Sequence, residues 1–246
     1  MDELLHYIKE NIFNLISILI GILGIILAAV FYFKTRKVKR PVYSLMSFKL
    51  LSAELKKVEN IEIKYLGKEI KNLTASKFAF WNGGRDTIDN SDIPESSKLT
   101  IKAKEDVIIY GAEIIYVSDD ANQVQLIKQK GKNEFKVLFD YLDYCQGGII
   151  KILHSGDSSN DLIITGKVKG TGNYKESEEK PNKEAPLPTQ ITCAIISIIT
   201  IVGGIFSKKY FWKIFLISIG LLFAYALIKS LKNPKFPKNL KKKFND

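Results

Sequence analysis

Four lysines crowd one short stretch of the sequence and form its strongest candidate for anion binding. They lie on either side of Gly131, at Lys128, Lys130, Lys132 and Lys136. A hairpin at this point would present a dense positive tip, which suits the phosphates of a nucleotide or a single-stranded oligonucleotide. Lys167 and Lys169 would add to this tip if the last strand lies alongside. The alternative is a solvated edge, because lysines on edge strands commonly protect against strand pairing.

A second candidate is the stretch WNGGR, from Trp81 to Arg85. Asn82, Gly83 and Gly84 can supply the positive φ angles of a tight turn, so one interpretation is a strand that ends in a hairpin. The functional alternative is a ligand-facing rim with Asn82 at its centre. In that rim Trp81 stacks on a base and Arg85 pairs with a phosphate.

Catalytic chemistry finds few candidate residues. Between residues 41 and 188, His154 is the only imidazole and Cys145 the only thiol. Neither a metal cluster nor a nucleophile with its base has convincing members in this set. We therefore expect no enzyme activity, no cofactor and no metal site.

Short strands must position these residues. Between residues 42 and 170, runs rich in β-branched and aromatic residues alternate with turn residues. The runs are Leu45 to Leu51, Ile61 to Leu66, Thr74 to Trp81, Leu99 to Ala103, Val107 to Val117, Gln123 to Gln129, Phe135 to Phe139, Ile149 to Leu153 and Leu162 to Val168. Several alternate with a period of two, which indicates antiparallel sheets with one wet face. The pattern predicts an all-β, sandwich-like domain over residues 42–170.

Three apolar segments flank this domain, at residues 12–33, 190–206 and 210–229. Their length and composition predict three transmembrane helices. Basic residues follow the first segment, and a basic tail at residues 230–246 follows the last. The positive-inside rule then predicts a multi-pass protein of the bacterial inner (cell) membrane, with its N-terminus outside and with a cytoplasmic β domain and tail. The polar residues 171–188 predict a flexible linker.

The net charge of +11 follows the same division of the chain. Residues 41–188 carry 21 Lys and Arg against 22 Asp and Glu, so the excess lies in the flanking segments. This distribution favours attraction to an anionic lipid bilayer over nucleic-acid binding by total charge.

Small and polar residues form one stripe along the first apolar segment. They are Asn14, Ser17, Gly21, Gly24 and Ala28. Such a stripe lets helices approach closely, and Cys193, Ser197, Thr200 and Gly204 repeat the spacing in the second segment. Either the two stripes pack against each other within a subunit, or copies of the chain assemble around an axis with Asn14 and Ser17 facing it, which gives a pore or a sealed bundle.

Membrane helices around a cytosolic β domain without a catalytic set resemble the membrane effectors of bacterial anti-phage nucleotide-signalling systems. The plan is similar to the β-rich transmembrane effectors of CBASS and to the membrane effector of the Hailong system. The resemblance covers the architecture along most of the chain and no residue motif, and CBASS members keep both helices at the N-terminus. It implies a homo-oligomeric ion channel or membrane-disrupting pore, gated by a nucleotide or oligonucleotide, with a nucleotidyltransferase partner. The alternative is a non-conducting membrane scaffold whose sandwich recruits a protein partner.

Overall fold

The chain divides into two compact units, which are described one at a time. Residues 1–36 and 184–233 form the first unit, and residues 37–183 and 234–246 form the second. The computed structural model describes residues 35–51, 64, 65, 67–70, 72–177, 188–207, 209–232 and 235–245, and single positions in the N-terminal segment (14, 17, 20, 21, 24, 25, 27, 28, 31 and 32).

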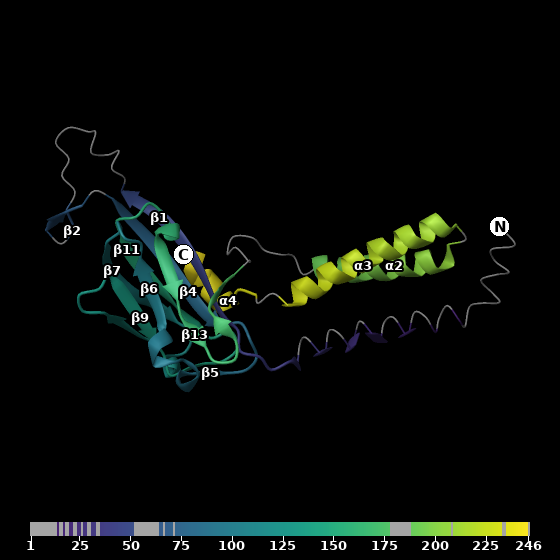
Figure 1. Cartoon of the computed structure of the whole chain (residues 1–246), viewed down its shortest axis with the longest axis horizontal. Helices are drawn as coiled ribbons and strands as arrows, with labels where there is room; N and C mark the ends of the chain where they lie inside the picture. Colours follow the sequence, from purple (N-terminus) through teal and green to yellow (C-terminus); the bar gives the residue numbers. More distant parts are fainter. Residues whose placement is uncertain are drawn as a thin grey trace. The chain divides into compact units, whose positions relative to one another are not determined.

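The second unit is built from strands, short 3-10 turns and one helix (Figure 1). Its long strands are β1 (Pro41–Leu51), β4 (Leu73–Asn82), β6 (Leu99–Ala103), β7 (Ile109–Val117), β8 (Gln125–Lys128), β9 (Glu134–Leu138), β11 (Gly147–His154) and β12 (Leu162–Thr165). Its two-residue strands are β2 (Lys64–Tyr65), β3 (Lys68–Glu69), β5 (Ile88–Asp89), β10 (Tyr141–Leu142), β13 (Lys167–Val168), β14 (Gly172–Asn173) and β15 (Lys175–Glu176). The 3-10 turns are η2 (Asn90–Asp92), η3 (Glu95–Ser97), η4 (Asp120–Asn122) and η5 (Ser159–Asp161), and the helix is α4 (Lys238–Asn245).

Two sheets make up the body of this unit. One has five strands in the order β15-β1-β4-β11-β7, and the other has four in the order β12-β6-β9-β8. Pairing is antiparallel in both sheets except between β1 and β15, which run parallel. Because alternate residues of a strand face opposite sides, the inner faces of both sheets contribute to one core that includes Phe78, Phe80, Leu99, Ile101 and Ile150. The predicted all-β sandwich is therefore supported.

Helix α4 covers part of the outer face of the five-stranded sheet, against β4 and β11 (Figure 1). Phe236, Leu240 and Phe244 follow one another at intervals of four residues, so a helix places the last two on one side. These three side chains form a second buried cluster with Val42, Ala79, Trp81 and Ile149. The predicted basic tail thus carries a helix that belongs to the sandwich unit.

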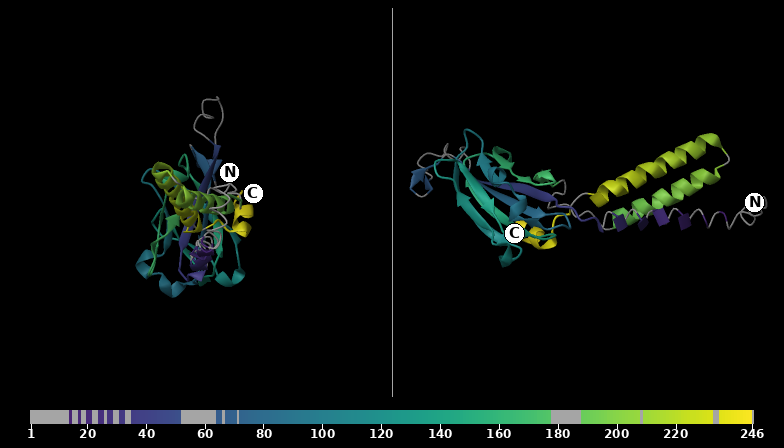
Figure 2. Two further views of the ribbon diagram at one scale, coloured as in Figure 1. Left: turned by 90° about the vertical axis from the view of Figure 1, so that its right-hand side faces the viewer. Right: turned by 60° about the horizontal axis from the view of Figure 1, so that its bottom comes forward.

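Two helices, α2 (Pro188–Phe206) and α3 (Tyr210–Lys232), pack side by side in the first unit (Figures 1 and 2). The hydroxyl of Ser197 donates a hydrogen bond of 2.9 Å to the carbonyl of Gly220. A Cβ at Gly220 would stand 2.3 Å from Cγ1 of Ile201. Glycine at this position therefore allows the close approach of the two helices.

The predicted membrane architecture is contradicted. Within the described residues, no helix is long and apolar enough to cross a membrane. The parts of α2 and α3 that carry no charge and begin and end with a large apolar residue run from Ile191 to Phe206 and from Ile214 to Ile228. They span roughly 24 Å and 22 Å at ~1.5 Å per residue, short of a ~30 Å hydrocarbon core. The three transmembrane helices, the inner-membrane location and the ion channel were thus wrong predictions; the segment 12–33 lies largely outside the described residues.

The linker prediction needs a correction at its first residues. Strands β14 and β15 lie inside the segment 171–188, and β15 pairs with β1. Residues 178–187 of that segment lie outside the described residues.

Candidate functional site

The outer face of the four-stranded sheet carries the candidate site. Leu99 and Ile101 of β6 face the core, so Thr100 and Lys102 face the opposite side. Across the β6–β9 pair, Thr100 stands opposite Lys136 and Lys102 stands opposite Glu134. The alternation of β6 and β9 thus sets a row of polar and charged side chains on one surface.

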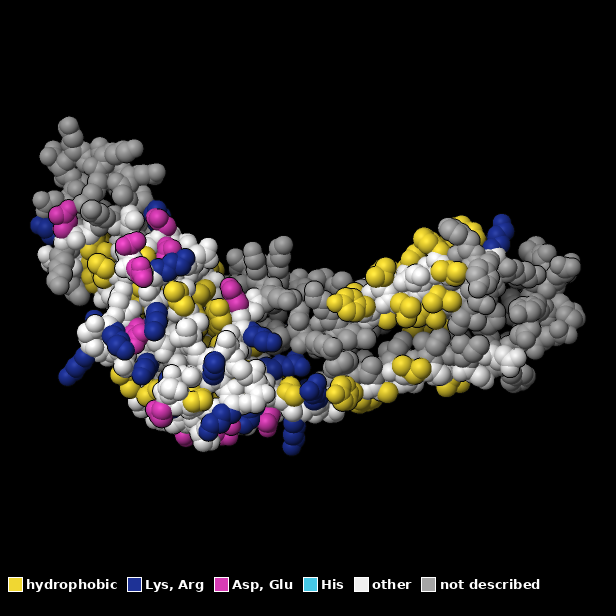
Figure 3. Space-filling view, viewed as in Figure 1, with side chains coloured by type: hydrophobic (Ala, Val, Ile, Leu, Met, Phe, Trp, Pro, Cys, Tyr) yellow, Lys and Arg dark blue, Asp and Glu magenta, His cyan; other side chains and the backbone are white. Residues whose placement is uncertain are grey.

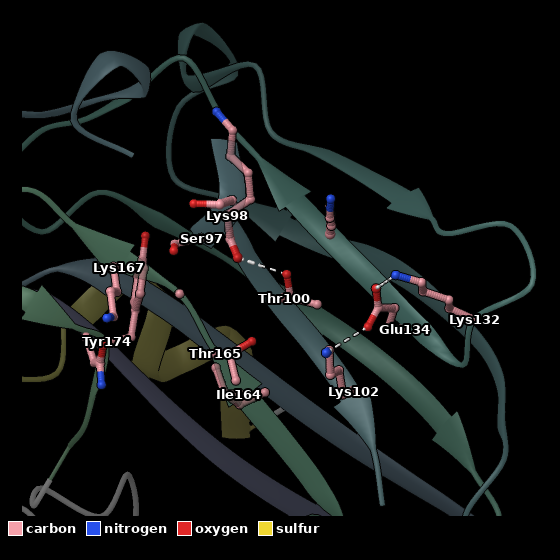
Figure 4. Close-up of a pocket in the computed structure, with 14 residues that line it drawn as sticks. Ser97, Lys98, Thr100, Lys102, Lys132, Glu134, Ile164, Thr165, Lys167 and Tyr174 are labelled. Atoms are coloured by element: carbon pink, nitrogen blue, oxygen red, sulfur yellow. Dashed lines mark hydrogen bonds and ion pairs between the residues drawn. The ribbon is translucent and has the colours of Figure 1, made fainter. Parts of the chain in front are cut away.

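A cavity of ≈ 500 Å³ lies over this surface, and we call it the lysine pocket (Figure 4). Its walls come from η3, from β6, β9 and β12, and from the β13–β14 hairpin. The charged residues that line it are Lys98, Lys102, Lys132, Lys136, Lys167 and Glu134. Five lysines therefore face one carboxylate, and the volume lies within the ~300–1,000 Å³ range of small-molecule sites.

Three of these lysines already have acidic partners. Glu134 is buried, and its carboxylate lies 3.2 Å from Nζ of Lys102 and 3.9 Å from Nζ of Lys132. Lys98 is buried as well, with its Nζ 2.9 Å from Glu95 and 2.8 Å from the side-chain oxygen of Asn90. These ion pairs shape the walls and reduce what the three lysines can offer to a ligand.

Lys136 and Lys167 are the uncommitted charges of the pocket. Neither has an acidic partner among the described residues. Lys136 comes from β9 in the four-stranded sheet, whereas Lys167 comes from β13. An anion that bridges them would contact two separate walls of the pocket.

Tyr174 adds an uncommitted hydroxyl to the same pocket. Only 7% of the residue is exposed, and its hydroxyl has no hydrogen-bond partner among the described residues. Figure 4 shows this hydroxyl at the end of the ring that points toward Ser97. Gly166 has a φ of +153°, and a Cβ there would stand 3.2 Å from Cδ2 of Tyr174, so glycine makes room for the ring. Burial raises the pKa of Tyr174, which therefore remains a neutral hydrogen-bond donor.

The structure divides the four lysines predicted from sequence between two places. Lys132 and Lys136 line the lysine pocket. Lys128, Lys130 and again Lys132 line a second cavity at the β8–β9 turn. Nζ of Lys128 lies 5.9 Å from the centre of the Phe135 ring, a cation–π distance. Lys167 joins the lysine pocket, while Lys169 donates to the carbonyl of Ser91 instead.

Trp81 cannot serve as the exposed stacking platform considered for it. The residue is fully buried, and its ring centroid lies 4.6 Å from that of Phe236. The guanidinium of Arg85 lies 5.2 Å from the centre of the Tyr144 ring. The proposed rim therefore does not form, because α4 and Phe236, two residues before it, cover Trp81.

The Asn82-Gly83-Gly84 sequence receives the chain that enters the sandwich. The backbone N–H of Gly83 donates to the carbonyl of Arg40 at 2.8 Å, and a Cβ at Gly84 would stand 1.9 Å from the carbonyl oxygen of Val38. This close approach of two backbones explains the glycine. The predicted hairpin does not form, because β4 pairs with β1 and β11 and the next strand, β5, pairs with β10.

The described residues of the N-terminal stripe do not test its predicted role in helix packing. Asn14, Ser17, Gly21, Gly24 and Ala28 are helical and exposed. A Cβ at Gly21 or at Gly24 would meet no described atom within 4 Å. The described contacts of α2 are with α3 instead, through Ser197.

The candidate catalytic residues His154 and Cys145 both lie in shielded surroundings. His154 and Ser76 are both fully buried and lie 2.8 Å apart, so this pair has no access to a substrate. Burial raises the pKa of the Cys145 thiol, which weakens it as a nucleophile. No group of three metal-ligating side chains occurs within the described part of the chain.

Sequence reasoning missed Lys98, Lys102 and Tyr174. Lys102 had a signal, because it alternates with Leu99 and Ile101 and so belongs to an outer face. The only sequence signal for Tyr174 is that it is the single aromatic residue between Gly170 and Pro188. The fold brings these residues together by placing the β13–β14 hairpin, a separate two-stranded sheet, beside the β6–β9 pair, and no local pattern reveals this arrangement.

No family model, no curated protein and no solved structure matches this chain.

Proposed function

We propose that the sandwich is a binding module for a phosphorylated ligand, a nucleotide or a short oligonucleotide, which it holds in the lysine pocket. The observation that carries the proposal is the excess of five lysines over one carboxylate around a cavity of ≈ 500 Å³. Hydrogen bonds to charged groups are among the stronger polar interactions in proteins, at about 1.5–3 kcal/mol each.

The two uncommitted lysines define how the ligand binds. Lys136 and Lys167 contact phosphate oxygens, and Lys102 and Lys132 screen the Glu134 carboxylate from the same anion. Glu134 in turn accepts hydrogen bonds from hydroxyl or amino groups of the ligand. A ligand with a phosphate at one end and a sugar or base at the other uses both kinds of group.

The ligand class agrees with the expectation from sequence that a nucleotide signal reaches this domain. In this proposal the chain acts as the receptor of a nucleotide-signalling system for anti-phage defence, with a nucleotidyltransferase as the source of the ligand. The protein itself supplies recognition and no catalysis.

The test compares two pairs of lysines on the full-length protein. Isothermal titration with ATP, inorganic tripolyphosphate and a ten-nucleotide single strand gives the affinities. Lys136→Gln with Lys167→Gln should weaken binding by at least tenfold, because two charged contacts are lost. Lys128→Gln with Lys130→Gln removes the same charge from the β8–β9 turn and should change binding less than threefold.

Two results would overturn the proposal. One is the absence of binding for all three probes. The other is equal loss of affinity in both double variants, which would mean that total charge and not the lysine pocket attracts the probe.

A further inference from the structure

The lysine pocket has two walls that belong to different parts of the chain. Lys136 and Thr100 lie on the four-stranded sheet, whereas Lys167, Asn173 and Tyr174 come from the β13–β14 hairpin and the residue after it. Residues 172–177, which we call the strap, begin with β14, the second strand of this hairpin, and continue through β15. In the strap, β15 pairs with β1, and the N–H of Ser177 donates to the carbonyl of Tyr43 at 2.7 Å.

We propose that the hydroxyl of Tyr174 donates a hydrogen bond to a phosphate oxygen of the bound ligand, and that this contact locks the strap onto the sandwich. The inference rests on the proposed function and adds to it a specificity residue and a mechanical consequence. A ligand held by Lys136 on one wall and by Lys167 and Tyr174 on the other cross-links the two walls.

The unpartnered state of the hydroxyl carries the argument. A buried hydroxyl without a partner destabilises a protein, and buried polar groups are therefore almost always hydrogen-bonded. Tyr174 is 93% buried, counting from its 7% exposure, and the residue lines the lysine pocket with the hydroxyl end of its ring beside Ser97 (Figure 4). A phenylalanine would fill the same space against Gly166 and Leu99 without this cost. A ligand that accepts this hydrogen bond explains why the residue is a tyrosine. Groups that serve function often reduce stability in this way.

The strap is short and holds to the sheet through few groups. Its parallel pairing with β1 covers two residue pairs, Val42 with Lys175 and Tyr43 with Glu176. Few hydrogen bonds make such a segment open locally more easily than the central strands. The strap also precedes the segment that leads to α2, so its docking determines where the chain leaves the sandwich.

The test uses Tyr174→Phe, with Tyr110→Phe as the matched control. Tyr110 donates to the carbonyl of Asn72 and does not line the lysine pocket. With tripolyphosphate as the probe, Tyr174→Phe should lower the affinity about tenfold, whereas Tyr110→Phe should leave it unchanged. Without the probe, Tyr174→Phe should raise the melting temperature by about 2–4 °C, since it removes an unpaired buried hydroxyl.

Amide hydrogen exchange measures directly how often the strap opens. Saturating tripolyphosphate should slow exchange at the amides of Tyr174 and Ser177 in the unchanged protein, and less so in Tyr174→Phe at equal saturation. Binding that is normal in Tyr174→Phe would overturn this inference while leaving the proposed function standing. So would a lowered melting temperature of the probe-free variant, since the hydroxyl would then have a structural role. If the unchanged protein binds ATP or the ten-nucleotide strand but not tripolyphosphate, this inference fails alone, whereas the proposed function fails if none of the three probes binds.

Discussion

Asn82 shows how one side chain joins three segments of the sandwich. Its side-chain oxygen accepts from the backbone N–H groups of Arg40 and Gly84, and its side-chain nitrogen donates to the carbonyls of Asp86 and Leu142. An asparagine supplies two donor hydrogens and a carbonyl oxygen with two lone pairs, so its full hydrogen-bonding capacity is used.

Asn82→Ala should therefore cost about 2–4 kcal/mol in the free energy of unfolding, because it leaves buried backbone groups without partners. Urea unfolding of the full-length protein measures this change. Asn160→Ala, in the exposed η5 turn, is the control and should cost less than 1 kcal/mol. Equal losses in the two variants would contradict the role of Asn82 as a structural centre.

His154 gives the sandwich a dependence on pH. Its Nδ1 accepts from the N–H of Gly156, so its Nε2 carries the proton and donates to Ser76. Burial lowers the pKa of His154, although Asp161 opposes this shift.

Because the folded pKa lies below the unfolded value of about 6.5, the unfolded chain binds more protons as the pH falls. The stability of the sandwich should therefore be fully present above pH ~6.5 and decline from there down to the lowered pKa, by at most about 1.4 kcal/mol per pH unit. Urea unfolding at several pH values between pH ~5 and ~7.5 follows this loss. His154→Asn should be less stable at neutral pH and nearly flat over the same range; an equally steep decline in that variant would exclude His154 as the cause.

At the scale of elements, α4 is held to the sheet by a small apolar cluster and one polar contact. Leu240 and Phe244 are fully buried, and Nζ of Lys77 donates to the carbonyl of Phe244 at 3.0 Å. That lysine satisfies a carbonyl of the last helical turn, where the helix itself offers no donor. The contacts make α4 a part of the sandwich fold.

Leu240→Ala should release α4 and expose Trp81, at a cost of about 2–5 kcal/mol. The emission of Trp81 should shift to longer wavelength, measured in a Trp212→Phe background because the chain has two tryptophans. Lys242→Gln, an exposed position in the same helix, serves as the control. An unshifted spectrum in Leu240→Ala would mean that α4 stays docked without its central contact.

The α2–α3 pair leaves large apolar side chains exposed, as the hydrophobic surface of this unit in Figure 3 shows. Ile199, Leu221, Leu222 and Tyr225 are each more than 60% exposed. Apolar patches of this kind mark surfaces that associate. We expect a second copy of the chain to cover this apolar surface of α2 and α3. The same homo-oligomer is the prediction from sequence.

Leu222→Glu should shift the protein toward the monomer, because a charge at the centre of the contact loses its hydration. Light scattering on a sizing column measures the mass of the full-length protein and of this variant. Lys209→Glu, exposed in the α2–α3 connection, should not change the mass. A monomeric unchanged protein would contradict the expectation.

The strands were predictable because their pattern is local. Each of the nine runs chosen from sequence overlaps a strand, and Leu99–Ala103 has the same bounds. The docking of α4 was missed because KNLKKKFN reads as a solvated basic segment unless Leu240 and Phe244 are seen to share a face. Trp81 was considered as a ligand-facing residue for the same reason, since the helix that buries it lies more than 150 residues away along the chain. The membrane prediction was wrong because it overestimated the length of the apolar segments. In α3, lysines near both ends shorten the apolar part.

For the whole molecule, folding changes where the positive charge lies. With α4 included, the sandwich unit carries 29 Lys and Arg against 22 Asp and Glu, a net charge of +7, although residues 41–188 alone are nearly neutral. On the face seen in Figure 3, Lys and Arg side chains are spread widely over the sandwich. A general attraction to anions therefore accompanies the specific contacts of the lysine pocket, and an experiment must separate the two.

Salt dependence makes this separation. Each phosphate contact to a single strand adds about 0.7 to the slope of log affinity against log salt, so loss of Lys136 and Lys167 should reduce the slope by about 1.4. Lys242→Gln with Lys243→Gln removes two positive charges as well, but from α4, which does not line the lysine pocket. This variant should change the slope much less. Fluorescence titration of the full-length protein with a labelled ten-nucleotide strand, from ~50 to ~200 mM salt, gives both slopes. If the α4 pair flattened the slope as much as the pocket pair, the strand would be bound by the overall field of a basic protein, and the lysine pocket would have no special part in it.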